Sequence, residues 1–124
     1  MGGKFSIKSR MRSFGYAFRG IFRAFSTEHN LWIQGSIAIL VIVAGFYFEI
    51  SQIEWLGIIL AIGLVFSAEL MNTAVENIVD FISPDFNRKA GHAKDAAAGA
   101  VLMAAITAAV IGCLVFIPHI IDSL

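Results

Sequence analysis

Three carboxylates and one amide recur at helical spacing in the middle of this sequence, at the end of an apolar run. The run extends from Trp55 to Ala68. At about 100° per residue, one narrow face of a continuing helix collects four polar side chains, those of Glu69, Asn72, Glu76 and Asp80. A carboxylate at the centre of a membrane helix costs roughly 2.5–3.5 kcal/mol, so such residues usually serve a function. Because like charges on one face repel each other, the pattern predicts a bound cation, of which Mg²⁺ is the natural choice.

The expected depth of these side chains in the membrane indicates which kind of reaction they could serve. If Trp55 marks the outer interface, Glu69 lies about 21 Å further along the helix, at 1.5 Å per residue. In a hydrocarbon core of about 30 Å, Glu69 then lies near the inner headgroups, while Asp80 reaches the cytoplasm. This geometry suits a reaction between a membrane lipid and a soluble cosubstrate. The alternative is a polar seam that holds helices together, which is an equally good interpretation of Asn72 alone.

The composition indicates the helices that position these four polar side chains. The chain has 124 residues, of which 58% are hydrophobic and 15% are charged. A soluble domain of this size cannot hide so much apolar surface, so we predict a single-domain, all-α integral membrane protein spanning residues 1–124. Apolar length and helical periodicity place membrane helices at residues 31–48, 54–81 and 94–117. Residues 1–27, with Phe side chains at helical spacing among Arg and Lys, predict an amphipathic helix on the inner membrane surface.

The distribution of basic residues predicts the orientation. Lysine and arginine gather in the first 23 residues and again between residues 88 and 94, whereas the connection from Glu49 to Glu54 has none. The positive-inside rule therefore places the amino terminus in the cytoplasm and the carboxyl terminus outside. Ser83-Pro84-Asp85 breaks the second span, and residues 86–92 are expected to form a short basic loop with Gly91 as a hinge. The membrane surface accounts for the basic amino end, so no nucleic-acid partner is expected.

Other charged residues are candidates for binding phosphate. Lys94 near the start of the third span can offer a phosphate both a cation and free N–H groups, although a snorkelling lysine is an equally good interpretation. Arginines of the amino helix, such as Arg10, can also meet phosphate. Glu28 is most simply an acid in the first turn of the first span, where Ser26 or Thr27 would provide the cap.

Small residues recur at every fourth position of the third span. They are Ala96, Ala100, Ala104, Ala108 and Gly112. Such a ridge of small residues allows helices to approach closely in lipid. Because three spans enclose little interior, we expect another copy of the chain to complete the site.

The motifs that carry the chemistry resemble one known family. Its members have similar sequences to Glu69-Leu70-Met71-Asn72-Thr73-Ala74-Val75-Glu76, Val79-Asp80, Ser83-Pro84-Asp85 and Ala93-Lys94-Asp95-Ala96-Ala97-Ala98-Gly99-Ala100-Val101-Leu102. The resemblance is to the small prokaryotic diacylglycerol kinases and covers almost the whole chain from about Ser13. The pieces Ile50-Ser51 and Glu54-Trp55-Leu56 look more like the undecaprenol kinase branch of that family.

The resemblance implies a homotrimer in a bacterial cytoplasmic membrane, with composite sites between neighbouring chains. It implies transfer of the ATP γ-phosphoryl group to a lipid hydroxyl, with undecaprenol favoured over diacylglycerol. By this resemblance Glu69 is the general base, Asn72 orients the base or the lipid, and Glu76 with Glu28 holds Mg²⁺. Lys94 and Asp95 bind the nucleotide. Arg10 and Tyr16 match nucleotide- or lipid-contacting positions of the amino helix only loosely.

Two other functions are compatible with the residues alone. One is a small proton- or cation-conducting oligomer that uses Glu69, Asn72 and Glu76 as ion ligands. The other is a membrane scaffold without catalytic activity, assembled through the alanine ridge.

Overall fold

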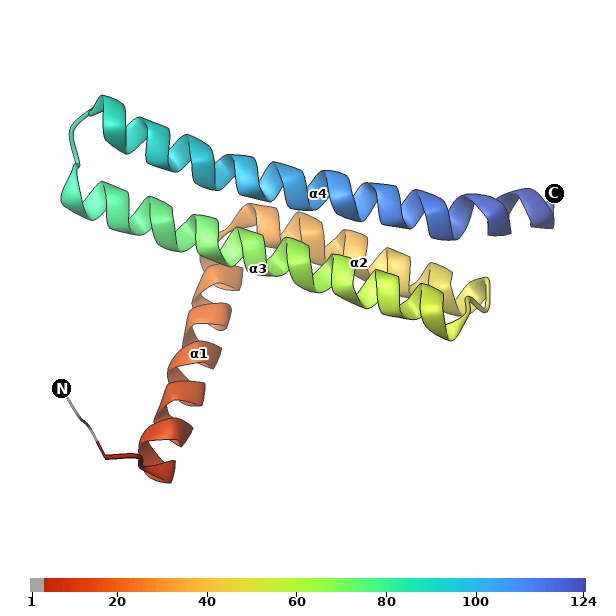
Figure 1. Cartoon of the computed structure of the whole chain (residues 1–124), viewed down its shortest axis with the longest axis horizontal. Coiled ribbons are helices and arrows are strands. Elements are labelled where there is room, and N and C mark those ends of the chain that lie inside the picture. The colour runs from red at the N-terminus through yellow and green to blue at the C-terminus, as the bar shows by residue number, and fades with distance from the viewer. Residues whose placement is uncertain (1–3) are drawn as a thin grey trace.

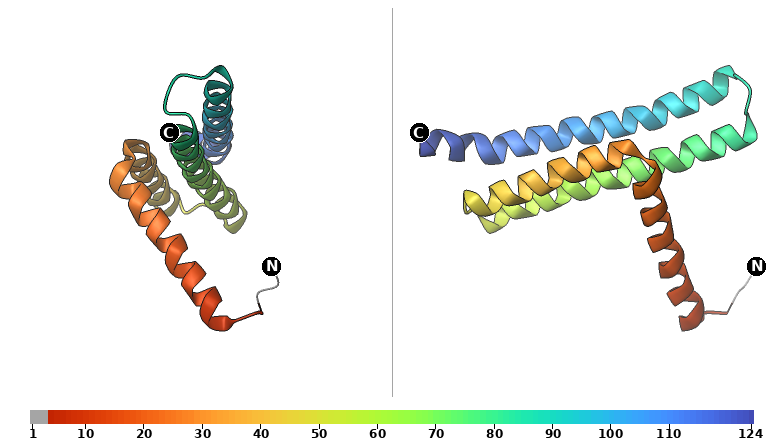
Figure 2. Two further views of the ribbon diagram at one scale, coloured as in Figure 1. Left: turned by 90° about the vertical axis from the view of Figure 1, so that its left-hand side faces the viewer. Right: turned by 180° about the vertical axis from the view of Figure 1, so that it is seen from behind.

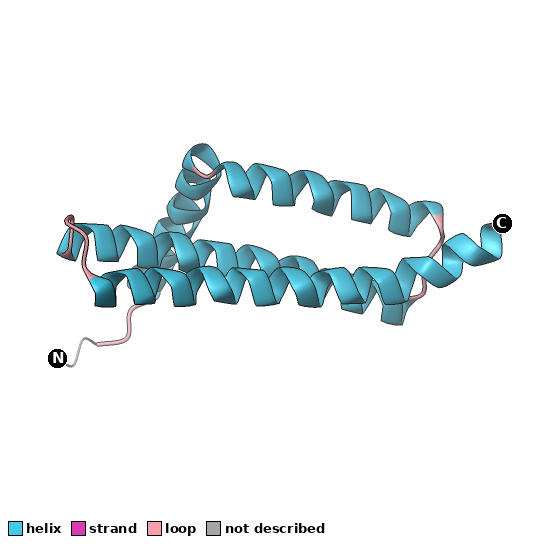
Figure 3. Cartoon of the chain, turned by 90° about the horizontal axis from the view of Figure 1, so that it is seen from above, coloured by secondary structure: helices cyan, strands magenta, loops and turns pink. Residues whose placement is uncertain are grey.

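Four helices make up residues 4–124, the part of the chain that the computed structural model describes (Figure 1). They are α1 (Ile7–Thr27), α2 (His29–Tyr47), α3 (Gln52–Ile82) and α4 (Arg88–Ser123). Within this described part, α2, α3 and α4 are the helices long and apolar enough to cross a membrane. The prediction of an all-α membrane protein with three spans is therefore confirmed. Short loops join the helices (Figure 3).

Helix α1 leaves the other three at a steep angle, whereas α2, α3 and α4 run side by side (Figures 1 and 2). Among the residues of α1, Ala24 near its carboxyl end is buried. Long apolar side chains such as Phe14 and Phe22 stay exposed along the helix. Its placement on the membrane surface stays a prediction, and residues 1–3 of the predicted surface segment lie outside the described residues.

The most extensive packing in the chain joins α3 to α4, which form a long antiparallel hairpin (Figure 1). Small residues contribute to this contact: a Cβ atom added to Gly57 of α3 would lie 3.5 Å from Cγ2 of Ile111 on α4, and Ala104 of α4 is buried. Ala104 belongs to the alanine ridge, so part of the ridge is used inside the chain. Ala96 and Ala100 of the same ridge remain exposed.

The turn between α2 and α3 forms a tightly packed end of the bundle. A Cβ atom added to Gly45 would lie 2.5 Å from Cη2 of Trp55, so the glycine is what allows α2 to approach α3 here. Ser51 caps α3 reciprocally with Glu54. The Glu54 carboxylate also meets Nε2 of His119 at 3.0 Å. This contact holds the end of α4, which continues past Pro118 to Ser123 instead of stopping at the predicted residue 117.

The connection between α3 and α4 is shorter than the sequence predicts. Of the expected loop 86–92, only Phe86 and Asn87 lie in the connection, because α4 begins at Arg88 and Gly91 lies inside the helix. The physical reason is a cap: the Asn87 side chain accepts hydrogen bonds from the backbone N–H groups of Lys89 (2.9 Å) and Ala90 (3.2 Å).

The junction between α1 and α2 also differs from the prediction. Ser26 and Thr27 do not cap α2, since both hydroxyls donate back to the carbonyl oxygen of Arg23. Glu28 ends α1 and precedes α2, and its side chain makes no capping hydrogen bond. The indole N–H of Trp32 donates to the carbonyl oxygen of Phe25, which fixes the direction of α2 relative to α1.

Candidate active site on the third helix

Glu69 is the most deeply buried polar residue on the carboxylate face of α3. Its side chain is 2% exposed. Nε2 of Gln34, on α2, donates a hydrogen bond to Oε2 of Glu69 at 3.2 Å. The other carboxylate oxygen, Oε1, is left available to accept a proton. The role of general base that the resemblance implies for Glu69 would require a substrate hydroxyl within hydrogen-bonding distance of this carboxylate.

Exposure increases along the same face toward the end of α3. Asn72 is 8% exposed, Glu76 is half-buried, and Asp80 is exposed. The helix therefore joins a dry carboxylate to solvent-accessible ones, as the spacing in the sequence predicts.

Two amide–carboxylate pairs share one pattern. Gln34 donates to Glu69, and Nδ2 of Asn72 donates to Oε1 of Glu76 at 3.2 Å. In each amide the oxygen is buried and has no hydrogen-bond partner within the described chain. Because buried polar atoms are nearly always hydrogen-bonded, these two oxygens are available to donors from water or a ligand.

Lys94 connects the carboxylate face to α4. Its Nζ lies 2.9 Å from Oδ1 of Asp80, and both side chains are partly exposed. Lys94 is six residues into α4, so it does not lie among free N–H groups at a helix start, as we expected from the sequence. Its ammonium group is available as a cation only. Asp95 is exposed beside it.

The predicted residues near the amino end are placed differently. Glu28 is half-buried at the junction of α1 and α2. Arg10 and Tyr16 lie on the exposed length of α1, where their contacts are local: Arg10 lies over the Phe5 ring at 5.5 Å and Arg19 over the Tyr16 ring at 5.6 Å. Both residues are exposed and belong to α1, the helix that leaves the other three at a steep angle (Figure 1).

The donor set fits magnesium bound together with phosphate. Among residues 4–124, no three acidic, histidine or cysteine side chains gather into a metal-binding group. Magnesium, however, usually takes one or two protein carboxylates, several waters and substrate phosphates. Glu28 is not used as a cap and Asn72 contacts only one oxygen of Glu76, so each of these carboxylates could offer an oxygen to such a shared site.

Gln34 is the site residue that sequence reasoning did not assign. The sequence shows it as one of the two strongly polar residues of the first span, with Ser36. That signal marks Gln34 as unusual, but only the fold shows which face of α2 meets Glu69.

Comparison with known proteins shows which family the chain resembles along most of its length. The family described as prokaryotic diacylglycerol kinase matches residues 15–116. The chain is 45% identical to the undecaprenol kinase of Bacillus subtilis, over 88% of this chain and 89% of that protein. It is 37% identical to the diacylglycerol kinase of Synechocystis, over 89% of this chain and 63% of that protein. It is 28% identical to the diacylglycerol kinase of Escherichia coli, over 88% of this chain and 89% of that protein.

The chain therefore belongs to the prokaryotic diacylglycerol kinase family, a family of lipid kinases. Within it, the similarity to the Bacillus protein confirms the resemblance to the undecaprenol kinase branch. The comparisons give no support to an ion-conducting oligomer.

Proposed function

We propose that this protein transfers the γ-phosphoryl group of ATP to the primary hydroxyl of a membrane lipid at the cytoplasmic interface, in a magnesium-dependent reaction. The observation that carries the proposal is the buried Glu69, oriented by Gln34 on a face that becomes solvent-exposed toward Asp80. A lipid hydroxyl can approach this carboxylate from the membrane, while a nucleotide approaches from water.

In this mechanism Glu69 accepts the proton of the lipid hydroxyl as its oxygen attacks the γ-phosphorus. Asn72 lies one turn away and orients the base or the lipid. Glu76 and Glu28 hold Mg²⁺, which when bound neutralises charge on the phosphates. Phosphoryl transfer depends mainly on alignment and charge neutralisation, so the ammonium group of Lys94 and the neighbouring Asp95 serve to hold the nucleotide. Arg10 and Tyr16 would reach it from α1.

Undecaprenol is the favoured lipid, and diacylglycerol is the second candidate. The basis is the higher identity to a protein named undecaprenol kinase than to those named diacylglycerol kinase. Both lipids present a primary hydroxyl at the interface. The proposal includes a homotrimer in the bacterial cytoplasmic membrane, with the amino terminus inside and the carboxyl terminus outside.

Phosphate transfer from γ-labelled ATP tests the proposal. The purified chain is placed in phosphatidylcholine vesicles containing either undecaprenol or diacylglycerol, and vesicles without a lipid alcohol serve as the control. We expect labelled lipid with undecaprenol, less with diacylglycerol, and none after chelation of Mg²⁺. Absence of labelled lipid in both samples would contradict the proposed function. A preference for diacylglycerol would overturn only the choice of lipid.

A further inference from the structure

The carboxyl-terminal turn of α4 is weakly supported by the helix itself. Pro118 has no backbone N–H, so α4 lacks one internal hydrogen bond at the start of this turn. Every residue from Pro118 to Leu124 is exposed with the exception of His119, which is half-buried. The contacts that hold this turn to the rest of the chain are therefore mainly those of His119.

His119 joins the end of α4 to both of the other membrane helices. Its Nε2 lies 3.2 Å from Oε1 and 3.0 Å from Oε2 of Glu54, which is in the first turn of α3. Its ring lies 6.0 Å from the ring of Phe48, the residue that ends α2. The Glu54 carboxylate is fixed in turn by Ser51, whose backbone N–H donates to Oε1 at 3.0 Å.

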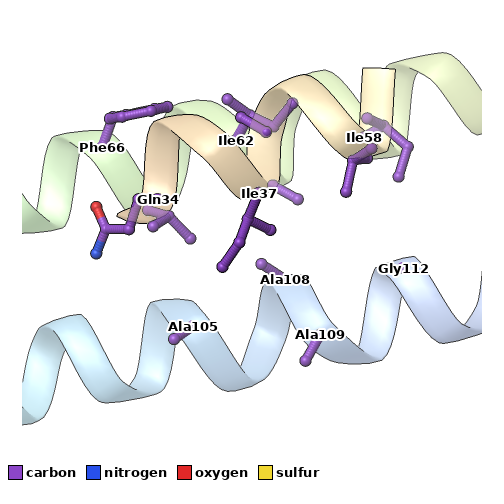
Figure 4. A pocket seen from close by; sticks show the side chains of 13 residues that line it. Gln34, Ile37, Ile58, Ile62, Phe66, Ala105, Ala108, Ala109 and Gly112 are labelled. Carbon is purple, nitrogen blue, oxygen red and sulfur yellow. The ribbon is translucent and has the colours of Figure 1, made fainter. Parts of the chain in front are cut away.

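Elsewhere in the described chain, α4 has little contact with α2. A cavity of about 330 Å³ lies between α2, α3 and α4 (Figure 4). Its wall on α4 consists of small residues, which are Ala105, Ala108, Ala109 and Gly112. Because these residues have almost no side chain, α4 does not fill the space toward α2 along this stretch. Contact with the end of α2 is made further along α4, where the rings of Phe116 and His119 lie next to that of Phe48.

Glu54 is the charged group that faces His119. The α2 side contributes the uncharged ring of Phe48. Glu49, in the turn between α2 and α3, and Asp122, on α4 itself, are exposed, and in the described chain neither forms an ion pair with His119. Both side chains of the His119–Glu54 pair are 28% exposed. The contact is thus partly shielded from water but still accessible to protons.

The charge on the imidazole determines how strongly this contact holds. A charged imidazole has an N–H on both ring nitrogens, and its hydrogen bond to a carboxylate is about twice as strong as a neutral one. A neutral imidazole has a hydrogen on one nitrogen only and no charge to attract the carboxylate. Histidine ordinarily changes its charge between about pH 5 and pH 8. The contact is therefore strongest where the imidazole is charged and the carboxylate is still ionised, and it weakens as the pH rises through that range.

We propose that His119 and Glu54 form a pH-sensitive latch at the end of the bundle where α4 terminates. The latch holds the carboxyl-terminal turn of α4 against α3 and the end of α2 at mildly acidic pH, and it releases the turn when the imidazole loses its proton. In the topology proposed above this end lies outside, so the latch responds to the pH of the external medium. It is independent of the proposed reaction, because Glu54 lies at the start of α3, whereas Asp80 lies near the other end.

A spin label on the last turn tests the latch. In a Cys113→Ser background, Ser123→Cys carries a nitroxide at the exposed end of α4, and Met103→Cys carries one in the middle of the same helix, where the side chain is 72% exposed. The labelled proteins are placed in phosphatidylcholine vesicles with the same buffer on both sides. The mobile fraction of each label is measured from about pH 5.5 to pH 8.5, across the titration of histidine. We expect the ratio of mobile to immobile label at position 123 to rise about fivefold as charge assistance is lost, and the label at position 103 not to respond.

Two substitutions remove the charge of one partner at a time. Glu54→Gln keeps the cap of α3, because glutamine also serves at this position of a capping box. His119→Gln keeps a polar side chain that does not titrate. With either substitution we expect the label at position 123 to be equally mobile at both ends of the pH range. His92→Gln is the matched control, because His92 is exposed near the other end of α4, and it should keep the full pH response.

Three results would overturn the inference. One is a pH response that persists in either Glu54→Gln or His119→Gln, which would assign it to other groups. The others are a label at position 123 that is immobile, or mobile, at every pH in the otherwise unmodified protein. Phosphate transfer by Glu54→Gln is measured alongside and should equal that of the unmodified protein. Absence of transfer in both would contradict the proposed function and leave the latch unaffected.

Discussion

At the scale of single residues, the contact of Glu69 with Gln34 is the most deeply buried polar contact of the candidate site. The two side chains meet at 3.2 Å, and Glu69 is 2% exposed within one chain. A buried carboxylate without a donor would be strongly disfavoured in its charged form. The Gln34 N–H provides one hydrogen bond to the carboxylate and restricts its rotation. The pair therefore supplies orientation as well as partial compensation for burial.

Glu69→Gln should assemble normally and lose nearly all turnover. The glutamine amide has almost the same size as the carboxylate but cannot accept the proton of the lipid hydroxyl. General-base catalysis typically contributes about 10²–10⁴-fold, and a loss of this size is expected. Phosphate transfer and cross-linking are measured on the same preparation. Retention of more than about a tenth of the turnover would remove Glu69 from the role of base.

Glu76→Gln should raise the magnesium concentration required for half-maximal activity. Glu76 is half-buried and shares one oxygen with Asn72, which leaves the other for a metal. Asp80→Asn is the control, because Asp80 is exposed and pairs with Lys94. Magnesium titrations of the three proteins make the comparison. If Glu76→Gln and the unmodified protein give the same titration curve, Glu76 is not a metal ligand.

These residues also show where the sequence is informative. The stripe from Glu69 to Asp80 follows from helical periodicity, because all its members belong to one helix. Gln34 is 35 residues away from its partner, and the apolar residues of α2 do not mark one face for α3. The pairing of Lys94 with Asp80 was missed for a related reason, since it depends on how the α3–α4 hairpin aligns.

At the scale of elements, the contact between α2 and α3 depends on one glycine. The Trp55 indole occupies the space where a Gly45 side chain would lie. Gln34 lies earlier in the same helix, so the packing of α2 against α3 at Gly45 also helps to hold the Gln34 amide near Glu69.

Gly45→Ala should therefore destabilise the protein by about 1–3 kcal/mol, the usual cost of overpacking. Gly63→Ala is the matched control, because a Cβ atom there meets nothing within 4 Å in the chain. The control should be neutral or slightly stabilising, since alanine favours helix over glycine. Thermal unfolding in detergent measures both. Equal unfolding temperatures for the two variants would show that Trp55 moves aside without cost.

Helix ends were less predictable than helix identities. Pro84 correctly marks the end of α3, which terminates at Ile82. The polar composition of residues 88–92 suggested a loop, yet α4 starts at Arg88 because Asn87 caps it. Apolar length indicates the part of a helix inside the membrane, whereas α4 extends beyond that part in both directions. Caps determine where such extensions begin, and they are weak signals in a sequence.

At the scale of the whole molecule, the alanine ridge serves two purposes. Ala104 packs inside the chain, while Ala96 and Ala100 remain exposed near the start of α4. The exposed part lies next to Lys94 and Asp95 in sequence, so a neighbouring chain that packs on it would come close to these residues. This arrangement is compatible with the predicted trimer with composite sites, in which carboxylates of one chain meet Lys94 of the next.

Mixing two inactive variants tests whether the sites are composite. Glu69→Gln inactivates the contribution of α3 to a site, and Lys94→Leu inactivates the contribution of α4. If each site is formed by α3 of one chain and α4 of the next, every mixed trimer contains one site in which both helices are unmodified. With random mixing at equal amounts, three-quarters of the trimers contain both kinds of chain. In each of these mixed trimers, one of the three sites is intact. About a quarter of the original activity should return in a cyclic trimer. Glu69→Gln mixed with Glu76→Gln is the control, because both changes lie on α3 and no intact half can be recovered. Activity in the first mixture no greater than in the separate variants would mean that each chain carries its own complete site, with Lys94 acting beside its own Asp80.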